Sequence, residues 1–333
     1  MPKTLLITGA TGKQGGSLID ELLAQEAEFE ILALTRDVNS ASAQDLVKKS
    51  PDVKLLAGTL DEPETVFRNA KNVTTQSIWG VFSVQVSCSV SSSSVDSGWL
   101  LAGGLRLKEQ AYMGSRSDIE EKQGKALIDA ALDNNVQYFV YTSADRGGDA
   151  SLDDPTAVPH FISKYNIENH LVEQAANNRR ENPMFWTILR PTVFFDNITP
   201  NFVGKVFLTV WKVVVKDKPL YYISVKDIGH FAALAFLNPD EYKGKCISLA
   251  GDALTFDEMA VRFKEKTGSD VPVTFEFIAR FVLWLVPDLG EMFSWFNRVG
   301  NKADIQQLRS VYPGLQDVGA WLEQESGFSV KGR

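Results

Sequence analysis

The sequence predicts an α/β protein with a doubly wound parallel sheet and a smaller, mainly helical C-terminal lobe. Through residue 190, short β-branched or apolar runs alternate with longer amphipathic segments, as in repeated strand–helix units. A glycine-rich turn follows the first run directly, and helical patterns dominate after residue 190. We therefore divide the chain into residues 1–190 and 191–333, and we expect the second part to share some elements with the sheet.

The predicted strands are short runs of apolar and β-branched residues, a composition that suits a buried parallel sheet. Residues 17–23 carry apolar side chains at helical spacing and are expected to cross over from the first strand to the second. In the second part of the chain, two further runs are predicted to be strands, at residues 246–249 and 272–275. The strands predicted in the first part are residues 5–8, 31–34, 53–56, 81–84, 138–141 and 186–190.

Residues 87–117 interrupt this alternation. The segment is rich in serine, contains a pair of adjacent glycines and lacks a clear periodicity, so we predict an irregular insert before a helix that starts at Ile119. Loops of more than about 15 residues without their own structure are uncommon in compact domains. Two explanations stay open, a genuine insert and an intron retained in the gene model.

Composition excludes several classes of function. With 44% hydrophobic and 23% charged residues the chain is expected to fold, and its formal net charge of −8 opposes direct binding to nucleic acid. The two cysteines, Cys88 and Cys246, form no CxxC motif or Cys/His cluster, so no metal site is expected. We find no signal peptide and no apolar stretch near the roughly 18 residues of a membrane span. We expect no membrane partner and a cytoplasmic location, or a nuclear one for a regulatory protein.

Gly9, Gly12 and Gly15 form a G-x-x-G-x-x-G motif directly after the first predicted strand and at the start of a helix. In that context the glycines permit a tight turn, a close approach of the backbone to a pyrophosphate, and close packing of helix on strand. The helix N-terminus then faces the phosphates, where N–H groups and the helix dipole favour anions. This pattern is typical of a Rossmann-type dinucleotide site, although the same glycines could merely close a strand–helix turn.

Arg36 stands at the end of the second predicted strand, where proteins that prefer NAD usually place an acidic residue on the ribose. A guanidinium can pair with a 2′-phosphate through two hydrogen bonds. The residue type therefore favours NADP as the cofactor, with NAD as the alternative. A second interpretation is that Arg36 is solvated and paired with its neighbour Asp37.

Several strings taken together resemble the NmrA-like family, a group of atypical short-chain dehydrogenases that also includes fungal regulators and NADP(H)-sensing proteins. The resemblance spans nearly the whole chain and is broken only at the serine-rich insert. It implies a dinucleotide-binding fold and either an oxidoreductase or a sensor function. The strings are residues 9–16, 35–36, 58–61, 121–125, 159–164, 189–192, 194–197 and 225–229.

The resemblance also implies roles for individual residues. It places a pyrophosphate against the phosphate loop, a 2′-phosphate on Arg36, and adenine beside Asp61 and Glu62, with Gln85 near the end of the fourth strand. The nicotinamide side would be formed by Lys122, Lys164, Phe194, Phe195, Asp196 and Asn197, and the phosphate loop by Gly9, Ala10, Thr11, Gly12, Lys13 and Gln14.

Three of these positions have a second interpretation. Asp61 could cap a helix that starts at Glu62, and for Asp227 we prefer a cap of the helix that contains Ile228. Lys122 could be an exposed helix lysine. The apolar, aromatic stretch at residues 277–296 is expected to pack the C-terminal lobe, although it could line an apolar substrate pocket.

The catalytic residues depart from the usual pattern of short-chain dehydrogenases, which is Tyr-x-x-x-Lys on the helix after the fifth strand. Here Lys164 is kept, but His160 stands in place of the tyrosine. Imidazole titrates close to neutral pH, so His160 could act as a general acid, or it could be structural. Ser143, at the end of the fifth strand, could polarise a substrate or be a turn residue. Tyr222 and Lys226 match the usual spacing but follow the sixth strand, and we treat that match as coincidence.

Two functions therefore stay open. The first is an NADP(H)-dependent oxidoreductase acting on a small carbonyl, enone or quinone, with the C-terminal part as the substrate-side lobe. The second is a non-catalytic NADP(H) sensor that regulates through a protein partner. The fold itself cannot choose between them, because related folds host both kinds of activity. The retained Lys164 favours the oxidoreductase.

Overall fold

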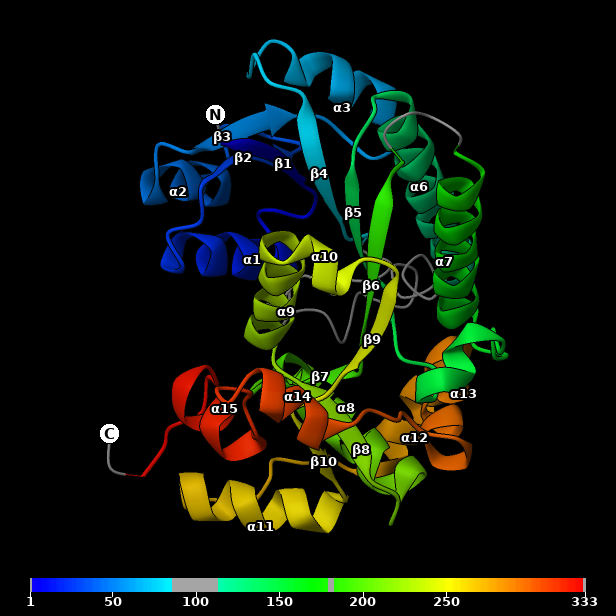
Figure 1. Ribbon diagram of the computed structural model, residues 1–333. Coiled ribbons are helices and arrows are strands. Elements are labelled where there is room, and N and C mark those ends of the chain that lie inside the picture. The colour runs from blue at the N-terminus through cyan, green and yellow to red at the C-terminus, as the bar shows by residue number, and fades with distance from the viewer. Residues whose placement is uncertain (1, 86–112, 179–182, 332–333) are drawn as a thin grey trace.

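The computed structural model describes residues 2–85, 113–178 and 183–331 (Figure 1). A seven-stranded sheet runs through the molecule in the order β3-β2-β1-β4-β5-β6-β9, and every neighbouring pair is parallel. The strand order reverses between β1 and β4, which is the point where open α/β sheets bind their ligands. The strands are β1 (Lys3–Ile7), β2 (Phe29–Thr35), β3 (Val53–Ala57), β4 (Ile78–Ser83), β5 (Tyr138–Thr142), β6 (Phe185–Pro191) and β9 (Lys245–Leu249).

Helices cover both faces of this sheet because successive strand residues point to opposite faces. On one face, Leu5 and Ile7 of β1 join a buried cluster with α1 (Lys13–Ala24) and α9 (Val225–Leu237). On the other face, Leu6 joins a cluster with the residues of α6 and α7. The remaining helices of this region are α2 (Ala41–Lys49), α3 (Pro63–Ala70), α6 (Met113–Asp133), α7 (Pro159–Asn177) and α10 (Pro239–Tyr242).

The C-terminal lobe has a core of its own around Trp211, Tyr222 and Phe293, which are all fully buried. A small sheet in the order β10-β8-β7 lies in this lobe. The elements of the lobe are β7 (Val193–Phe194), β8 (Leu220–Ile223), β10 (Asp252–Leu254), α8 (Phe202–Val210), α11 (Phe256–Thr267), α12 (Glu276–Leu285), α13 (Pro287–Arg298), α14 (Ile305–Val311) and α15 (Val318–Gln324). Among the short helical segments, η2 (Gly148–Leu152) lies between β5 and α7, η3 (Phe195–Asn197) follows β7, and η4 (Trp211–Val215) follows α8.

One predicted strand and one predicted helix start are wrong. Residues 272–275 form no strand, because the Thr274 N–H donates to the side chain of Thr209 (2.8 Å) instead of to a neighbouring strand. Helix α6 begins at Met113, so the last five residues of the predicted insert are helical. The outer turns of a helix need no apolar periodicity, so the lack of periodicity at residues 113–117 did not exclude a helix there. The remainder of the predicted insert lies outside the described residues.

The α12–α13 hairpin packs only on one side. Ala279 and Phe293 are fully buried, whereas Phe277 is 68%, Phe281 55% and Trp284 73% exposed. The prediction that this stretch packs the lobe therefore holds for its inner face alone. In the described residues, no helix is both long enough and apolar enough to cross a membrane.

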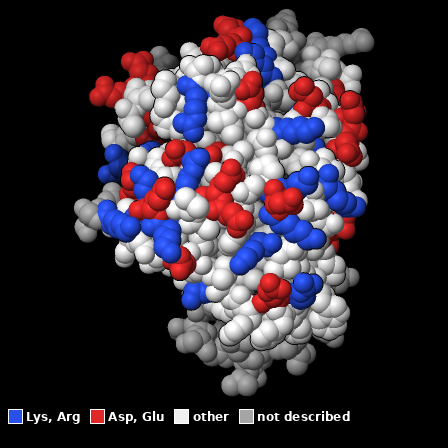
Figure 2. All heavy atoms as spheres, turned by 90° about the horizontal axis from the view of Figure 1, so that it is seen from below, with Lys and Arg blue, Asp and Glu red and all other residues white. Residues whose placement is uncertain are grey.

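Charges of both signs are interspersed over the end of the molecule that carries the C-terminal lobe. Figure 2 shows this end from below, with Lys and Arg lying beside Asp and Glu across its visible face. Ion pairs such as Arg262–Asp252 and Lys266–Glu323 neutralise part of the charge of this lobe. Binding to a phosphate backbone needs clustered basic side chains, and the visible face does not present one continuous basic surface.

Candidate functional site: a phosphate loop beside a buried charged cluster

The loop between β1 and α1 requires its glycines. Gly9 has φ +58°, a conformation that favours glycine, and a Cβ there would lie 2.7 Å from Val84 Cγ1. A Cβ on Gly15 would lie 2.5 Å from the carbonyl oxygen of Gly9. The turn is closed by the Gly12 N–H, which donates to the Gly9 oxygen (2.9 Å). The helix and the strand therefore approach each other too closely for any larger residue at these positions.

The N-terminus of α1 is suited to an anion. The N-cap residue of the helix is Gly12, which has no side chain. The N–H groups of the first turn therefore donate no hydrogen bond to a capping side chain. The helix follows β1 at the carboxyl edge of the sheet, next to the point where the strand order reverses. The glycines allow a ligand to approach the backbone closely, and the first N–H groups of the helix have no capping side-chain acceptor. Both features suit a dinucleotide pyrophosphate.

A second part of the site lies at the ends of β2 and β3. A hollow of about 340 Å³ is lined by five residues: Arg36, Gly58, Thr59, Glu62 and Thr65. Arg36 is exposed, and in the described residues it forms no ion pair with Asp37, whose carboxylate instead accepts the Asn39 N–H (2.8 Å). The guanidinium is thus available to an anion that enters the hollow.

Asp61 lies at the edge of this region but caps no helix. The N-cap of α3 is Glu62, and it makes no side-chain cap hydrogen bond. The Asp61 carboxylate accepts hydrogen bonds from Gln123 Nε2 (2.8 Å) and Thr59 Oγ1 (3.2 Å), and these bonds lower its pKa. The capping interpretation of Asp61 is therefore wrong, because its oxygens are used by the side chains of Gln123 and Thr59.

Gln85 and Lys122 differ in exposure. Gln85 follows β4, is buried and donates from Nε2 to Ser83 Oγ (2.7 Å), while its buried Oε1 has no hydrogen-bond partner in the described part of the chain. A buried carbonyl oxygen without a partner is costly and suits a site that receives a donor from a ligand. Lys122 is exposed on α6, in agreement with the interpretation as an exposed helix lysine.

A buried charged cluster joins α6 to α7 (the Glu120 cluster: Glu120, His160, Ser163 and Lys164). Glu120 Oε1 lies 2.7 Å from Lys164 Nζ, and Oε2 lies 3.1 Å from His160 Nδ1. Ser163 Oγ also donates to Oε2 (3.0 Å). Burial raises the pKa of Glu120, but the Lys164 and His160 charges and hydrogen bonds outweigh it and lower the pKa to about 2. Glu120 is thus a carboxylate held between two basic groups.

This cluster is connected to the phosphate loop through Thr142. Lys164 Nζ donates to the Thr142 carbonyl oxygen (3.3 Å) at the end of β5, and Thr142 Oγ1 donates to Gln14 Oε1 (2.7 Å). The structure therefore brings together Gln14, Lys164 and His160, which were predicted, with Glu120 and Thr142, which were missed. Glu120 lies in a predicted helix and Thr142 directly follows a predicted strand, but a sequence alone does not show contacts between distant elements.

Ser143 belongs to a different network. Its N–H donates to Leu189 O (2.7 Å), which extends the β5–β6 pairing and excludes the turn interpretation. Its hydroxyl accepts from Arg146 (3.4 Å), which is fully buried and pairs with Glu168 (2.8 Å). Arg190 also pairs with Glu168 (2.6 Å), and the two guanidinium groups keep the pKa of that carboxyl low against the effect of burial.

The segment Phe194 to Asn197 is divided between packing and the site. Phe195 is fully buried and stacks on Tyr222 and Trp321, with ring centroids 5.2 and 5.4 Å away, so its ring belongs to the core of the C-terminal lobe. Asp196 accepts from Lys13 Nζ (3.0 Å), which joins the phosphate loop to this lobe. Tyr222 is locked in the stack, in agreement with treating its spacing to Lys226 as coincidence.

Asp227 is not a helix cap. Ser224 is the N-cap of α9 and accepts from the Lys226 N–H, while Asp227 lies within the first turn and is fully buried. Its Oδ2 accepts the Gln316 N–H (3.0 Å), and burial raises its pKa to about 7. The predicted cap is wrong because Ser224, three residues earlier, already occupies that position.

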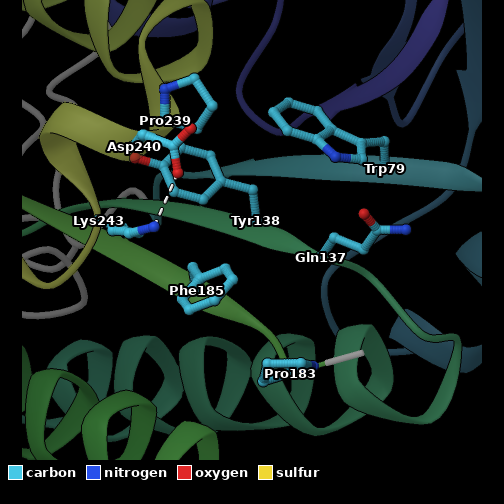
Figure 3. Close-up of a pocket in the computed structure, with 8 residues that line it drawn as sticks. All are labelled: Trp79, Gln137, Tyr138, Pro183, Phe185, Pro239, Asp240 and Lys243. Atoms are coloured by element: carbon cyan, nitrogen blue, oxygen red, sulfur yellow. Dashed lines mark hydrogen bonds and ion pairs between the residues drawn. The ribbon is translucent and has the colours of Figure 1, made fainter. Parts of the chain in front are cut away.

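A shallow hollow of about 170 Å³ lies at the opposite edge of the sheet (Figure 3). It is lined by Trp79, Tyr138 and Phe185 near the amino ends of their strands, with the Lys243–Asp240 ion pair at its rim. Ligands of open α/β sheets bind at the carboxyl ends of the strands, so this hollow does not belong to the candidate site. In the described residues, no group of three or more His, Cys, Asp or Glu could hold a metal ion.

Comparisons with known proteins agree with this architecture. The sequence model of the NmrA-like family matches residues 1–322. A protein of Aspergillus hancockii named NmrA-like family domain-containing oxidoreductase hkm9 is 26% identical over 288 residues, which cover 80% of this chain and 74% of that protein.

Two solved structures show the same fold. The negative transcriptional regulator NmrA in complex with NAD is 17% identical, has a TM-score of 0.63 and matches 97% of this chain and 95% of its own. The Escherichia coli NADPH-dependent quinone oxidoreductase QOR2, complexed with NADPH, is 18% identical, has a TM-score of 0.65 and matches 96% of this chain and 98% of its own.

Proposed function

We propose that this chain, which belongs to the NmrA-like family, is an NADP(H)-dependent oxidoreductase that reduces a small carbonyl, enone or quinone. The observation that carries the proposal is the run of contacts from the phosphate loop to the buried cluster, through Gln14, Thr142 and Lys164. It joins a dinucleotide cradle to a lysine and a histidine suited to charge stabilisation and proton transfer. The relatives that are named oxidoreductases support the same function.

When bound, NADPH would supply a hydride to the substrate, and the substrate oxygen that gains negative charge would take up a proton. In this proposal the Lys164 ammonium binds the nicotinamide ribose and favours negative charge on the reacting oxygen. His160 donates the proton, with its ring oriented by the contact between Nδ1 and Glu120 (3.1 Å). The buried ion pair of Lys164 keeps its ammonium in place.

We propose NADP(H) rather than NAD(H) as the preferred cofactor because Arg36 lines the hollow at the end of β2 without a pairing carboxylate from Asp37. A guanidinium gives a 2′-phosphate a charge-assisted, two-point contact. NmrA itself has been solved both with NAD and with NADP, so the fold accepts either dinucleotide. For this chain the proposal includes no direct nucleic-acid or membrane partner and a cytoplasmic location, in keeping with the free thiol of Cys246.

A second function, a sensor that binds NADP(H) without turnover and acts through a protein partner, is favoured by one observation. His160 stands where catalytic short-chain dehydrogenases carry a tyrosine. A sensor needs two conformations, and NADPH or NADP must bind one of them more tightly than the other. A ligand that binds both conformations equally does not shift the equilibrium between them.

Titration of the purified protein with NADPH, NADP and NAD, followed by a panel of carbonyls, enones and quinones, separates the two functions. For an oxidoreductase, Lys164→Ala weakens NADPH binding and turnover together. His160→Phe lowers kcat by about 10²–10⁴ with NADPH affinity largely kept. If no substrate in the panel oxidises NADPH, while NADPH and NADP differ in their effect on oligomeric state or partner binding, the sensor replaces the oxidoreductase.

A further inference from the structure

Glu120 on α6 contacts both proposed catalytic residues of α7, Lys164 and His160. Its carboxylate reaches Lys164 Nζ (2.7 Å), His160 Nδ1 (3.1 Å) and Ser163 Oγ (3.0 Å), all within two turns of α7. The side chain is 1% exposed. The two groups proposed to act on the cofactor and substrate are therefore held by opposite oxygens of one buried carboxylate.

Stability alone does not explain this carboxylate. Burying a charge costs several kcal/mol, which a buried ion pair recovers only partly. Other contacts also hold α6 and α7 together. Gly124 packs so closely on Ile167 that a Cβ there would lie 2.6 Å from that side chain, and the Glu121 carboxylate accepts a hydrogen bond from Asn166 (2.8 Å). His170 also contacts Asp129 across the same two helices (2.7 Å). The helices are thus joined at several points without the Glu120 cluster.

The cluster also has a defined place relative to the cofactor loop. Lys164 Nζ lies between Glu120 and the Thr142 carbonyl oxygen, and Thr142 contacts Gln14 on the phosphate-loop helix. A lysine side chain has many rotamers, and a single hydrogen bond at 3.3 Å to a carbonyl oxygen does not select one. The Glu120 oxygen lies closer, at 2.7 Å, and its negative charge attracts the ammonium, so the ion pair adds a second restraint.

We propose that Glu120 is a positioning residue, which fixes the Lys164 ammonium and the His160 ring for binding the nicotinamide half of the cofactor and for turnover. This inference rests on the proposed oxidoreductase function. Glu120 itself touches neither cofactor nor substrate in this proposal, and it acts through its two partners on α7. Its effect is therefore confined to the nicotinamide half of the site.

The test compares Glu120→Gln, which keeps the size but removes the charge, with Glu121→Gln on the same turn of α6. Glu121 pairs with Lys125 (2.6 Å) and Asn166 on the half-buried side of the helix, so it is the matched control. Two probes are titrated: NADPH, and adenosine 2′,5′-bisphosphate, which lacks the nicotinamide half. The melting temperature of each variant is measured in parallel.

For Glu120→Gln we expect an NADPH Kd at least about tenfold weaker, a kcat lowered at least about 10²-fold, and an unchanged Kd for adenosine 2′,5′-bisphosphate. Glu120→Asp, which keeps the charge, recovers part of the kcat, and Glu121→Gln stays within about twofold of the unmodified protein. A merely structural glutamate would weaken the binding of both probes together. A lower melting temperature is expected in either case, because Glu120→Gln leaves the buried Lys164 ammonium without its ion-pair partner.

Unchanged NADPH affinity and kcat in Glu120→Gln overturn the positioning role and leave the oxidoreductase intact. If the unmodified protein turns over no substrate, the proposed function fails, and the two binding titrations still decide the role of Glu120. If Glu120→Gln does not fold, Glu120→Asp carries the test: parallel losses of affinity for both probes then overturn the proposal, and a loss confined to NADPH supports it.

Discussion

At the scale of single residues, the choice of cofactor depends on Arg36. Its guanidinium lines the hollow at the ends of β2 and β3, and a charge-assisted pair with a 2′-phosphate contributes about 1.5–3 kcal/mol. We predict that Arg36→Asp weakens NADPH binding by about tenfold or more while NADH binding is kept. Arg280→Asp, on the exposed face of α12, makes the same charge change outside the site and is the control. Equal affinities of the unmodified protein for NADPH and NADH would contradict the assignment.

Asp227 gives a prediction about pH. Its folded-state pKa of about 7, against 3.8 for an exposed aspartate, results first from burial, while Gln316, Lys226 and Arg309 oppose the shift and Glu325 adds to it. Between about pH 4 and 7 the folded state holds a proton that the unfolded state has lost. The free energy of unfolding therefore falls as pH rises through this window, by about 1.4 kcal/mol per pH unit from this group.

Asp227→Asn removes that titration, so we predict that the variant gains stability relative to the unmodified protein as pH rises from 5 to 8. Urea unfolding at several pH values measures the difference. Asp45→Asn, at an exposed position on α2, is the matched control. If the stability difference between Asp227→Asn and the unmodified protein stays constant from pH 5 to 8, Asp227 does not titrate in this range.

Individual site residues were predictable from sequence where a local pattern marks them. The glycines, Arg36 and Lys164 stand at fixed positions relative to predicted strands and helices, so their spacing was informative. Glu120 and Thr142 were not predicted, because their roles come from contacts with residues far away in sequence, 40 positions for Glu120 and His160 and 128 for Thr142 and Gln14. Asp227 was misread because Ser224 and Asp227 are both good N-cap residues, and the sequence does not show which one the helix uses.

At the scale of elements, the turn between β1 and α1 depends on how closely a helix can approach a strand. Gly15→Ala would place a Cβ 2.5 Å from the Gly9 oxygen, so either helix or strand must move. At Gly16 the nearest atom is 3.5 Å away, an ordinary contact. We predict that Gly15→Ala lowers stability and abolishes NADPH binding, whereas Gly16→Ala keeps binding and gains about 0.5–1 kcal/mol from lower backbone entropy. Similar NADPH affinities for the two variants would contradict the close approach.

The hairpin of α12 and α13 offers two phenylalanines in opposite environments. Phe293 is fully buried and contacts Phe207 and Phe296, whereas Phe281 is 55% exposed. We predict that Phe293→Ala costs about 3–5 kcal/mol of unfolding free energy, while Phe281→Ala changes it by at most about 0.5 kcal/mol. Urea denaturation measures both. A large loss at Phe281 would mean that the outer face of α12 is covered in the folded protein.

Elements of the main sheet were predictable because each strand is a continuous apolar run with a helix after it. The three strands β7, β8 and β10 were missed, since each has at most four residues and their pairing depends on distant partners. Residues 272–275 were predicted as a strand from composition alone, although their backbone pairs with a side chain. The stretch at residues 277–296 was expected to pack the lobe, but composition alone could not tell which of its aromatic side chains the lobe covers.

At the scale of the whole molecule, the two parts predicted from sequence share one structure. Strand β9 comes from the second part of the chain and pairs with β6 in the main sheet. Helix α9, also from the second part, packs on α1, and His230 on α9 reaches Glu21 (2.7 Å). The cluster that buries Leu5 and Ile7 extends to Leu308 and Leu315 near the C-terminus. The division at residue 190 therefore separates two segments of sequence that contribute to a common core.

We predict from this shared core that the protein unfolds in one cooperative transition and that residues 191–333 do not fold alone. An isolated fragment of this part would lose the first part's share of the buried cluster that contains Phe231, Phe236 and Leu249. Tryptophan fluorescence reports on packing around Trp211, Trp295 and Trp321 in the lobe and around Trp79 and Trp186 on the main sheet, whereas far-ultraviolet circular dichroism reports on all helices and strands. Coincident urea curves from the two probes are expected for one transition. Separate midpoints, or a cooperative melt of the fragment, would show that the lobe is an independent domain.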